Sequence, residues 1–255
     1  MAVVALYNLK GGVGKTTGAV NLAHLASRLG RRTLVWDLDG QGAATFLIGR
    51  EPACHRARDA LVDGSRPLDD LVVTTAYEGL SLVPASPSYL DLDVALDATR
   101  KPARRLARLL EPLADQYDDV FIDCPPSMST LSASIVRAAD VVLVPLLPSP
   151  LAVRAFDQLS RFVAGTKHRP QVWAYFSMVD GRRRLHRELT ERLPGVWPGI
   201  LGARIPAASD IERMGVHRAP LVVFAPASRA ATAFEALASE LRGRFAAEPV
   251  AAMRR

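Results

Sequence analysis

The sequence is poor in cysteine, lysine and aromatic residues, and it has no apolar run long enough to span a membrane. Only two of its 255 residues are cysteines, Cys54 and Cys124, which is too few for a disulfide framework or a cysteine zinc site. The longest apolar run, residues 141–147, has the length of a buried strand. Because the first residues already read as a strand, we expect no signal peptide and a cytoplasmic protein.

Charge is unevenly distributed along this chain of formal net charge +6. Residues 1–150 hold 15 Lys/Arg against 17 Asp/Glu, whereas residues 151–220 hold 12 against 6. Only four of the 32 basic residues are lysines, and this arginine bias can reflect a GC-rich genome rather than a function. The regional excess is harder to attribute to composition, and it favours a surface that faces a polyanion.

A short apolar strand, a glycine-rich loop and a helix open the chain. Residues 2–7 are continuously apolar, as expected of a strand buried on both faces. Gly11, Gly12 and Gly14 let backbone N–H groups approach phosphate oxygens, and a helix is predicted from about Lys15. The partial positive charge of that helix N-terminus favours the same anion. This arrangement predicts a phosphate-binding loop (P-loop) rather than an ordinary glycine-rich turn.

The side chains at the end of the loop have the chemistry that a nucleotide and Mg²⁺ require. Lys15 can reach the β- and γ-phosphates, and the Thr16 hydroxyl is placed to ligate Mg²⁺. Thr17 is placed to hydrogen-bond the α-phosphate, and the amide of Val13 belongs to the phosphate-binding loop. We therefore predict a nucleotide-binding site with Mg²⁺ as its metal.

Two further predicted strands end in aspartate, at the sheet edge where α/β folds bind ligands. The strand at residues 32–38 is followed by Asp39, which is placed to act on water or Mg²⁺ beside the γ-phosphate. An Asp-Gly turn without chemistry is the alternative for this residue. The strand at residues 120–123 ends in Asp123, and after a P-loop this is the Walker B arrangement that holds Mg²⁺. The next residue, Cys124, is predicted to be small and buried rather than a nucleophile.

Strands alternate with helices along the chain, which is the pattern of an α/β fold with a doubly wound, mostly parallel sheet and helices on both faces. Further strands are predicted at residues 80–84, 141–147, 173–178, 200–206 and 221–224. Helices are predicted at residues 57–61, 102–117, 152–163 and 228–245. Pro112 should kink the second of these or end it early. We expect one domain over residues 1–255 without an N-terminal helix-turn-helix, because the P-loop starts at residue 10.

The loop departs from the general P-loop pattern in a way that resembles one family. The general pattern has glycine at the position of Leu9, whereas this chain has a second lysine, Lys10, at the loop entrance. This loop resembles the deviant Walker A motif of the ParA/MinD family of ATPases. The strings DLDGQGAAT and DCPP are also similar to that family, although Gly40 and Ala43 stand where its members have proline and asparagine.

Resemblance to the ParA-like branch implies an ATPase that positions or segregates a cargo such as a plasmid, a chromosome or a protein compartment. In that family ATP drives formation of a homodimer, in which Lys10 would act on the partner's phosphates. Asp39 would orient the attacking water, Thr16 and Asp123 would place Mg²⁺, and Pro206 is carried over as a nucleotide contact. Hydrolysis would be weak until a cargo-bound ParB-like or adaptor protein stimulates it.

The resemblance also implies nonspecific binding of double-stranded DNA, with association with the nucleoid in the ATP-bound state. Family members use basic residues after the strand that matches residues 173–178. Four arginines of this chain fall there: Arg182, Arg183, Arg184 and Arg187. Contacts to phosphates are independent of sequence and tolerant of position. A solvated arginine-rich face is the alternative.

A second family set of basic residues is incomplete in this chain. It follows an Ile-Pro-Arg string whose arginine is Ala207 here, and another family arginine aligns with Asp210. Arg204, Arg213 and Arg218 are candidates to compensate from neighbouring positions.

Other function classes fit the sequence less well. A MinD-like membrane-cycling ATPase would need a C-terminal amphipathic helix, whereas residues 246–255 contain proline and lack large apolar residues, so we expect no membrane partner. An iron–sulfur reductase would need paired cysteines, and a tyrosine kinase a tyrosine-rich tail, but no tyrosine follows Tyr175. A metabolic ATP-dependent ligase of the same superfamily stays open, and stimulation by a small-molecule acid rather than by DNA would favour it.

Overall fold

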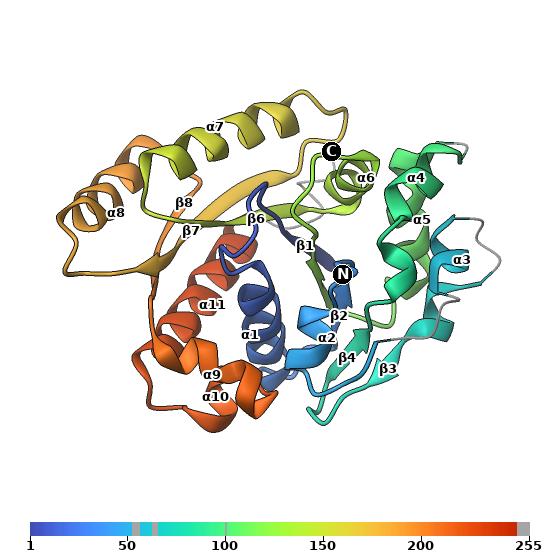
Figure 1. Cartoon of the computed structure of the whole chain (residues 1–255), viewed down its shortest axis with the longest axis horizontal. Helices are drawn as coiled ribbons and strands as arrows, with labels where there is room; N and C mark the ends of the chain where they lie inside the picture. The colour runs from blue at the N-terminus through green and yellow to red at the C-terminus, as the bar shows by residue number, and fades with distance from the viewer. Residues whose placement is uncertain (53–56, 63–65, 100, 249–255) are drawn as a thin grey trace.

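A computed structural model of the chain describes residues 1–52, 57–62, 66–99 and 101–248. These residues form one eight-stranded sheet with helices on both faces (Figure 1). The strands lie in the order β3-β4-β2-β5-β1-β6-β7-β8, and only the pairing of β3 with β4 is antiparallel among the described strands. The predicted mostly parallel α/β sheet is therefore confirmed.

The strands follow the apolar runs of the sequence closely. They are β1 (Ala2–Leu6), β2 (Thr33–Asp37), β3 (Val73–Thr74), β4 (Leu80–Val83), β5 (Asp119–Asp123), β6 (Val141–Leu146), β7 (Gln171–Val179) and β8 (Ile200–Pro206). Every residue of β1, β2, β5 and β6 is buried, because helices cover both faces of the centre of the sheet. β1 lies between β5 and β6, so the loop that follows it opens at the middle of the sheet edge.

The helices form two layers, one on each face of the sheet. They are α1 (Lys15–Arg28), α2 (Ala43–Leu47), α3 (Ala57–Val62), α4 (Leu92–Asp97), α5 (Arg105–Leu110), α6 (Thr130–Ala138), α7 (Pro150–Ala164), α8 (Arg184–Val196), α9 (Ser209–His217), α10 (Leu221–Phe224) and α11 (Arg229–Ala247). Short 3₁₀ turns are η1 (Leu68–Leu71), η2 (Pro87–Tyr89), η3 (Pro102–Arg104) and η4 (Glu111–Leu113). No helix within the described ranges has both the length and the apolar character needed to cross a membrane.

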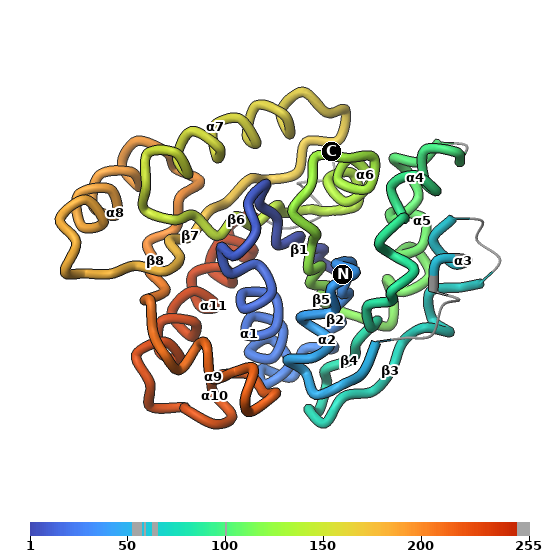
Figure 2. Tube along the Cα trace, in the orientation of Figure 1, coloured from blue at the N-terminus to red at the C-terminus, as the bar shows by residue number. Residues whose placement is uncertain are grey.

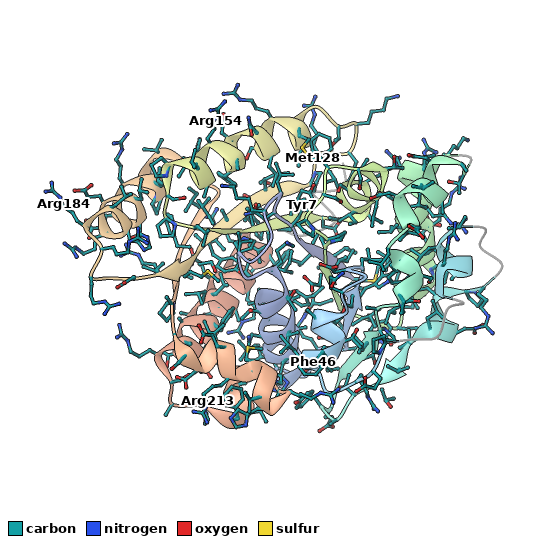
Figure 3. The ribbon with its side chains drawn as sticks, viewed as in Figure 1. Tyr7, Phe46, Met128, Arg154, Arg184 and Arg213 are labelled. Carbon is teal, nitrogen blue, oxygen red and sulfur yellow. The ribbon has the colours of Figure 1, made fainter. Side chains whose placement is uncertain are left out.

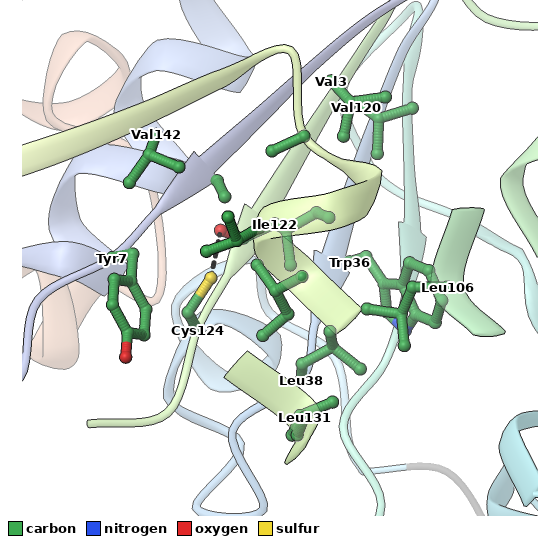
Figure 4. Packing of buried hydrophobic residues seen from close by; sticks show 14 of the residues in the cluster. Val3, Tyr7, Trp36, Leu38, Leu106, Val120, Ile122, Cys124, Leu131 and Val142 are labelled. Carbon is green, nitrogen blue, oxygen red and sulfur yellow. Dashed lines mark hydrogen bonds between the residues drawn. The ribbon is translucent and has the colours of Figure 1, made fainter. Parts of the chain in front are cut away.

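Two apolar clusters fill the space between the sheet and these layers. On β1, Val3 packs with residues of α5, α6 and α7, whereas its neighbour Val4 packs with residues of α1 and α11. This alternation is what a strand covered on both faces requires. Figure 4 shows part of the first cluster, in which the Cys124 thiol donates to the Ile122 carbonyl at 3.5 Å. Cys124 is fully buried, as predicted, and Cys54 lies outside the described residues.

Two predicted elements differ from the structure. Residues 221–224 form the short helix α10, so the prediction of a strand there is wrong. A four-residue apolar run does not distinguish a strand from a buried helical turn, and here Leu221 packs in the cluster of α1 and α11. The predicted helix at 102–117 is divided into η3, α5 and η4, and Pro112 lies in η4. The helix thus ends early at this proline, as predicted.

Candidate nucleotide-binding site

The loop between β1 and α1 has the backbone that its glycines predict. Gly12 and Gly14 have φ values of 68° and 96°, in the left-handed region that favours glycine. Nothing lies within 4 Å of a Cβ added at Gly11 or Gly12, so this part of the loop is open toward a ligand. At Gly14 the same Cβ would lie 2.9 Å from Ser177 Oγ on β7. The loop is therefore packed tightly against the sheet on one side and open on the other.

The two lysines of the loop have different environments. Lys15, the first residue of α1, is buried, and its ammonium donates to the Lys10 carbonyl at 3.2 Å. The Lys10 side chain is exposed, while its backbone N–H donates to Asn8 Oδ1 at 3.0 Å. Asn8 is held in turn, because its amide donates to the Pro145 carbonyl at 2.9 Å. Lys15 thus lies in the interior of the loop, whereas the Lys10 side chain projects from a backbone that Asn8 holds in place.

Thr16 and Asp123 meet at the start of α1. The Thr16 hydroxyl donates to Asp123 Oδ2 at 2.7 Å, and the other carboxylate oxygen, Oδ1, is buried without a hydrogen-bond partner among the described residues. A buried unpaired carboxylate oxygen beside a hydroxyl is a suitable donor pair for a hard cation. The two residues predicted to hold Mg²⁺ therefore lie together. The described part of the chain has no group of three or more acidic, His or Cys side chains fit for a metal.

A second buried acid, Asp37, lies beside Asp123. The two are register partners on the adjacent strands β2 and β5, and both are fully buried. Burial raises the pKa of Asp123 well above its usual range, and the charge of Asp37 adds to this effect. Burial also raises the pKa of Asp37 to about 6, although hydrogen bonds from Thr45 oppose the shift. A cation bound here would relieve the repulsion between the two carboxylates.

Asp39 lies on the loop that leads from β2 to α2. Its Oδ1 accepts the Gln41 N–H at 3.0 Å, and its own N–H donates to Asp37 Oδ1 at 3.3 Å. Asp37 thus supports the loop, a role that sequence reasoning missed. The first aspartate of the D-x-D string and its burial at a strand end were the available signal. At the end of the same sheet edge lies Pro206, the last residue of β8, whose register partner is Val179 on β7.

The segment after Asp123 crosses the same edge. The Tyr7 hydroxyl donates to the Ser127 carbonyl, and the Ser132 hydroxyl donates to the same atom at 2.6 Å. Met128, beside them, is 61% exposed (labelled in Figure 3). The start of this segment is therefore held by Tyr7, the residue that follows β1, and by Ser132 of α6.

The four predicted DNA-binding arginines occur together at the start of α8, but they are not equivalent. Arg182 makes a two-point ion pair with Asp180 at 3.0 Å. Arg184, the first residue of α8 (labelled in Figure 3), pairs with Glu188 at 2.6 Å. Arg187 donates to the carbonyls of Gly181 and Arg182. The Arg183 side chain is exposed, and its guanidinium makes no ion pair or hydrogen bond with the described residues.

The candidate compensating arginines make contacts within the chain. Arg204 donates to the Thr190 carbonyl at 3.1 Å, and Arg213 lies 3.9 Å from Asp210. Arg218 pairs with Glu51 at 2.8 Å. Figure 3 shows Arg213 on α9 well away from Arg184 on α8, whereas Arg204 contacts α8 through Thr190.

The fold and the site together define a P-loop protein with a second lysine in its loop and acidic residues at the ends of the adjacent strands β2 and β5. Comparison with known proteins supports this description. Residues 1–172 match a family model described as an AAA domain. The chain is 31% identical to the sporulation initiation inhibitor protein Soj of Bacillus subtilis over 94% of this chain and 97% of that protein. It is 30% identical to the chromosome partitioning protein ParA of Myxococcus xanthus, over 95% and 88% of the two chains.

This chain therefore belongs to the ParA/MinD family of P-loop ATPases. A solved structure gives the same fold: cobyrinic acid a,c-diamide synthase from Mycobacterium smegmatis, with bound ATP analogue and magnesium. Its TM-score is 0.79 and its sequence identity 27%, and the match covers 96% of each chain.

Proposed function

We propose that this protein is an ATP-dependent, dimerising ATPase of the ParA type that binds nonspecific double-stranded DNA and positions a cargo. The observation that carries the proposal is the pair of lysines: Lys15 is buried in the loop, whereas Lys10 projects from a braced backbone and is exposed. An exposed lysine at the mouth of a phosphate loop is available to a second nucleotide site. The Soj and ParA relatives support the same assignment.

In this proposal ATP and Mg²⁺ occupy the site described above. Lys15 and the amides of residues 11–14 bind phosphate, and Thr17 contacts the α-phosphate. Thr16 and Asp123 hold Mg²⁺, which neutralises charge on the phosphates when bound. Asp39 orients the attacking water, and Pro206 contacts the base. Lys10 acts on the partner's phosphates in the ATP-bound homodimer.

DNA binding is proposed for the start of α8. Arg183 carries it most directly, because its charge is not paired with any described acidic residue. Arg182 and Arg184 keep their acidic partners at 3.0 and 2.6 Å and contribute less unless DNA replaces them. Arg187 shapes the loop through the Gly181 carbonyl, which it contacts at 2.8 Å. We further propose a cytoplasmic protein that associates with the nucleoid when ATP is bound, and whose hydrolysis a cargo-bound ParB-like or adaptor protein stimulates.

Retention on nonspecific double-stranded DNA tests this function. The protein is measured without nucleotide, with ADP, with ATP, and as Asp39→Ala with ATP. We expect retention only with ATP and longer retention for Asp39→Ala. Arg183→Ala should weaken retention and lower its salt dependence by about one ion, whereas Arg108→Ala, an exposed arginine on α5, should not. Equal retention in every nucleotide state would contradict the proposal.

A metabolic ATP-dependent ligase is the second candidate, since the solved structure described above is named as a diamide synthase and shares the fold over 96% of both chains. Hydrolysis stimulated by a small carboxylic acid, with no retention on DNA, would favour it. We do not propose a membrane partner. The C-terminal tail on which that expectation rests lies mostly outside the described residues.

A further inference from the structure

Arg218 connects the C-terminal end of α9 to the segment that follows Asp39. Its guanidinium lies over the Phe46 ring, 4.6 Å from the ring centre. The Nε–H donates to the Phe46 carbonyl at 3.3 Å, and Nη2 donates to the Arg50 carbonyl at 3.0 Å and to Glu51 at 2.8 Å. One side chain thus holds both the aromatic residue of α2 and the carbonyls at and beyond its C-terminal end.

The opposite side of α2 is held within the nucleotide site. The backbone N–H and the hydroxyl of Thr45 donate to Asp37 Oδ2 at 2.8 and 2.7 Å. The same hydroxyl accepts the Ala85 N–H at 2.8 Å. The loop that carries Asp39 lies between Asp37 and α2, so holding α2 from both sides fixes where this loop ends.

The segment that carries Arg218 is itself joined to the P-loop helix. Asn21 of α1 is buried; its side-chain carbonyl accepts the Leu221 N–H at 2.9 Å, and its side-chain amide donates to the Thr17 carbonyl at 2.8 Å. The same amide lies 3.4 Å from Met214 Sδ on α9. Figure 2 shows α9 and α10 at the end of α1, with α2 beside them. A continuous set of contacts therefore runs from the first turn of α1 to α2.

We propose that Arg218 is a positioning residue for ATP hydrolysis, which holds α2 on α9 and thereby fixes the Asp39 loop relative to the P-loop. This inference rests on the proposed function, because it requires that Asp39 act on the attacking water. Holding a catalytic group in place can determine a large part of a rate.

The geometry shows which part of the Arg218 contact matters. Glu51 is 79% exposed, and an ion pair with such a partner contributes little. The stacking on Phe46 and the two carbonyl contacts require a planar group with several donors, which lysine lacks. The guanidinium is thus engaged within the chain, which argues against Arg218 as a DNA contact.

The test compares Arg218→Ala and Arg218→Lys with the wild type, and with Arg242→Ala, an exposed arginine of α11, as the control. Residue 218 has φ 47°, so both variants have the same backbone strain and differ only in the side chain. ATP affinity, kcat at saturating ATP, and amide hydrogen exchange of residues 43–50 without nucleotide are measured. We expect both variants to lose about tenfold in kcat. Their ATP affinity should stay within about twofold, with faster exchange confined to this segment.

Three results would overturn the inference. The first is an unchanged kcat in Arg218→Ala. The second is an equal loss of ATP affinity and kcat together with a lower Tm, because Arg218 would then be merely structural. If the wild type itself does not hydrolyse ATP, the proposed function fails, and hydrogen exchange then decides about Arg218. Faster exchange of residues 43–50 would still support its holding role, and unchanged exchange would be the third overturning result.

Discussion

Leu90 packs directly over Gly40, the residue that follows the proposed water-orienting Asp39. A Cβ at Gly40 would lie 3.0 Å from Leu90 Cδ2 and 3.2 Å from the Leu90 backbone nitrogen. Gly40 stands where the family string has proline, so this chain fills with a leucine the space that a ring would occupy. The Asp39 loop is thus restrained by its contact with Leu90, the residue after η2, rather than by the fixed backbone of a proline.

This contact predicts that substitution at Gly40 is destabilising. Gly40→Ala should lower the free energy of unfolding by about 1–3 kcal/mol, because the added methyl group meets Leu90. The double variant Gly40→Ala with Leu90→Ala should recover part of this loss, since the Leu90 side chain is removed while its backbone remains. Chemical denaturation measures both. A double variant no more stable than Gly40→Ala would show that the leucine side chain is not the obstacle.

Removal of the Thr16 hydroxyl should abolish the dependence of nucleotide binding on Mg²⁺. Thr16 donates to Asp123 Oδ2 at 2.7 Å, so the hydroxyl lies where a cation would contact both groups. Thr16→Val is expected to weaken ATP binding in Mg²⁺ by tenfold or more, about 1.4 kcal/mol. Binding measured in EDTA should change little. Thr16→Ser, which keeps the hydroxyl, is the matched control, and equal Mg²⁺ dependence in Thr16→Val would contradict the metal assignment.

The buried acid Asp37 predicts an unusual pH dependence of stability. Its pKa is raised to about 6 in the folded protein, chiefly by burial. The unfolded chain therefore loses this proton at lower pH than the native state, so Asp37 contributes a fall in stability as pH rises from about 4 to 6. His24, whose pKa burial lowers to about 4, contributes a rise over the same range. Asp37→Asn should remove the Asp37 contribution and be more stable than the wild type at pH 7, by an amount on the order of 2 kcal/mol.

Denaturation at pH 4, 5, 6 and 7 without metal or nucleotide measures this effect. Glu212→Gln, an exposed acid of α9, should keep the wild-type pH profile. A stability difference between Asp37→Asn and the wild type that does not grow between pH 4 and 7, with the variant less stable at pH 7, would contradict the assignment. Saturating Mg²⁺ and ATP should reduce the decline in the wild type, because a bound cation favours the ionised carboxylate.

Substitution of alanine for two helical glycines, Gly18 and Gly215, should change stability in opposite directions or to very different extents. Gly18 of α1 has no room for a Cβ, because the Tyr175 hydroxyl and Leu6 Cδ1, the latter at 3.2 Å, occupy that space. Gly18→Ala should therefore displace α1 from β1 and lower both stability and ATP affinity. Gly215 of α9 has open space and an ordinary φ, so Gly215→Ala should be neutral or stabilise by about 0.5–1 kcal/mol. Tm and ATP affinity of the two variants measure the contrast, and an equal response would argue against the tight packing of α1.

Local sequence determined much of this protein. The apolar runs specified the buried central strands because a strand covered on both faces needs no polar alternation. The glycines and the two lysines specified the loop, and Asp39 and Asp123 were recognisable as acids at strand ends. These features follow from neighbours in the chain, so no contact over a long sequence separation was needed to find them.

Only the tertiary structure decided the remaining features. Residues 221–224 form a helix because the Leu221 N–H donates to Asn21, two hundred positions earlier in the sequence. They do not pair with β8, which therefore stays the edge strand of the sheet. Asp37 became a supporting residue because Thr45 and Asp123 surround it in the fold. Arg218 reads in the sequence as one more basic residue, and its role depends on an aromatic ring 172 positions earlier in the chain. Such contacts join distant segments, and their partners are fixed by packing rather than by spacing in the sequence.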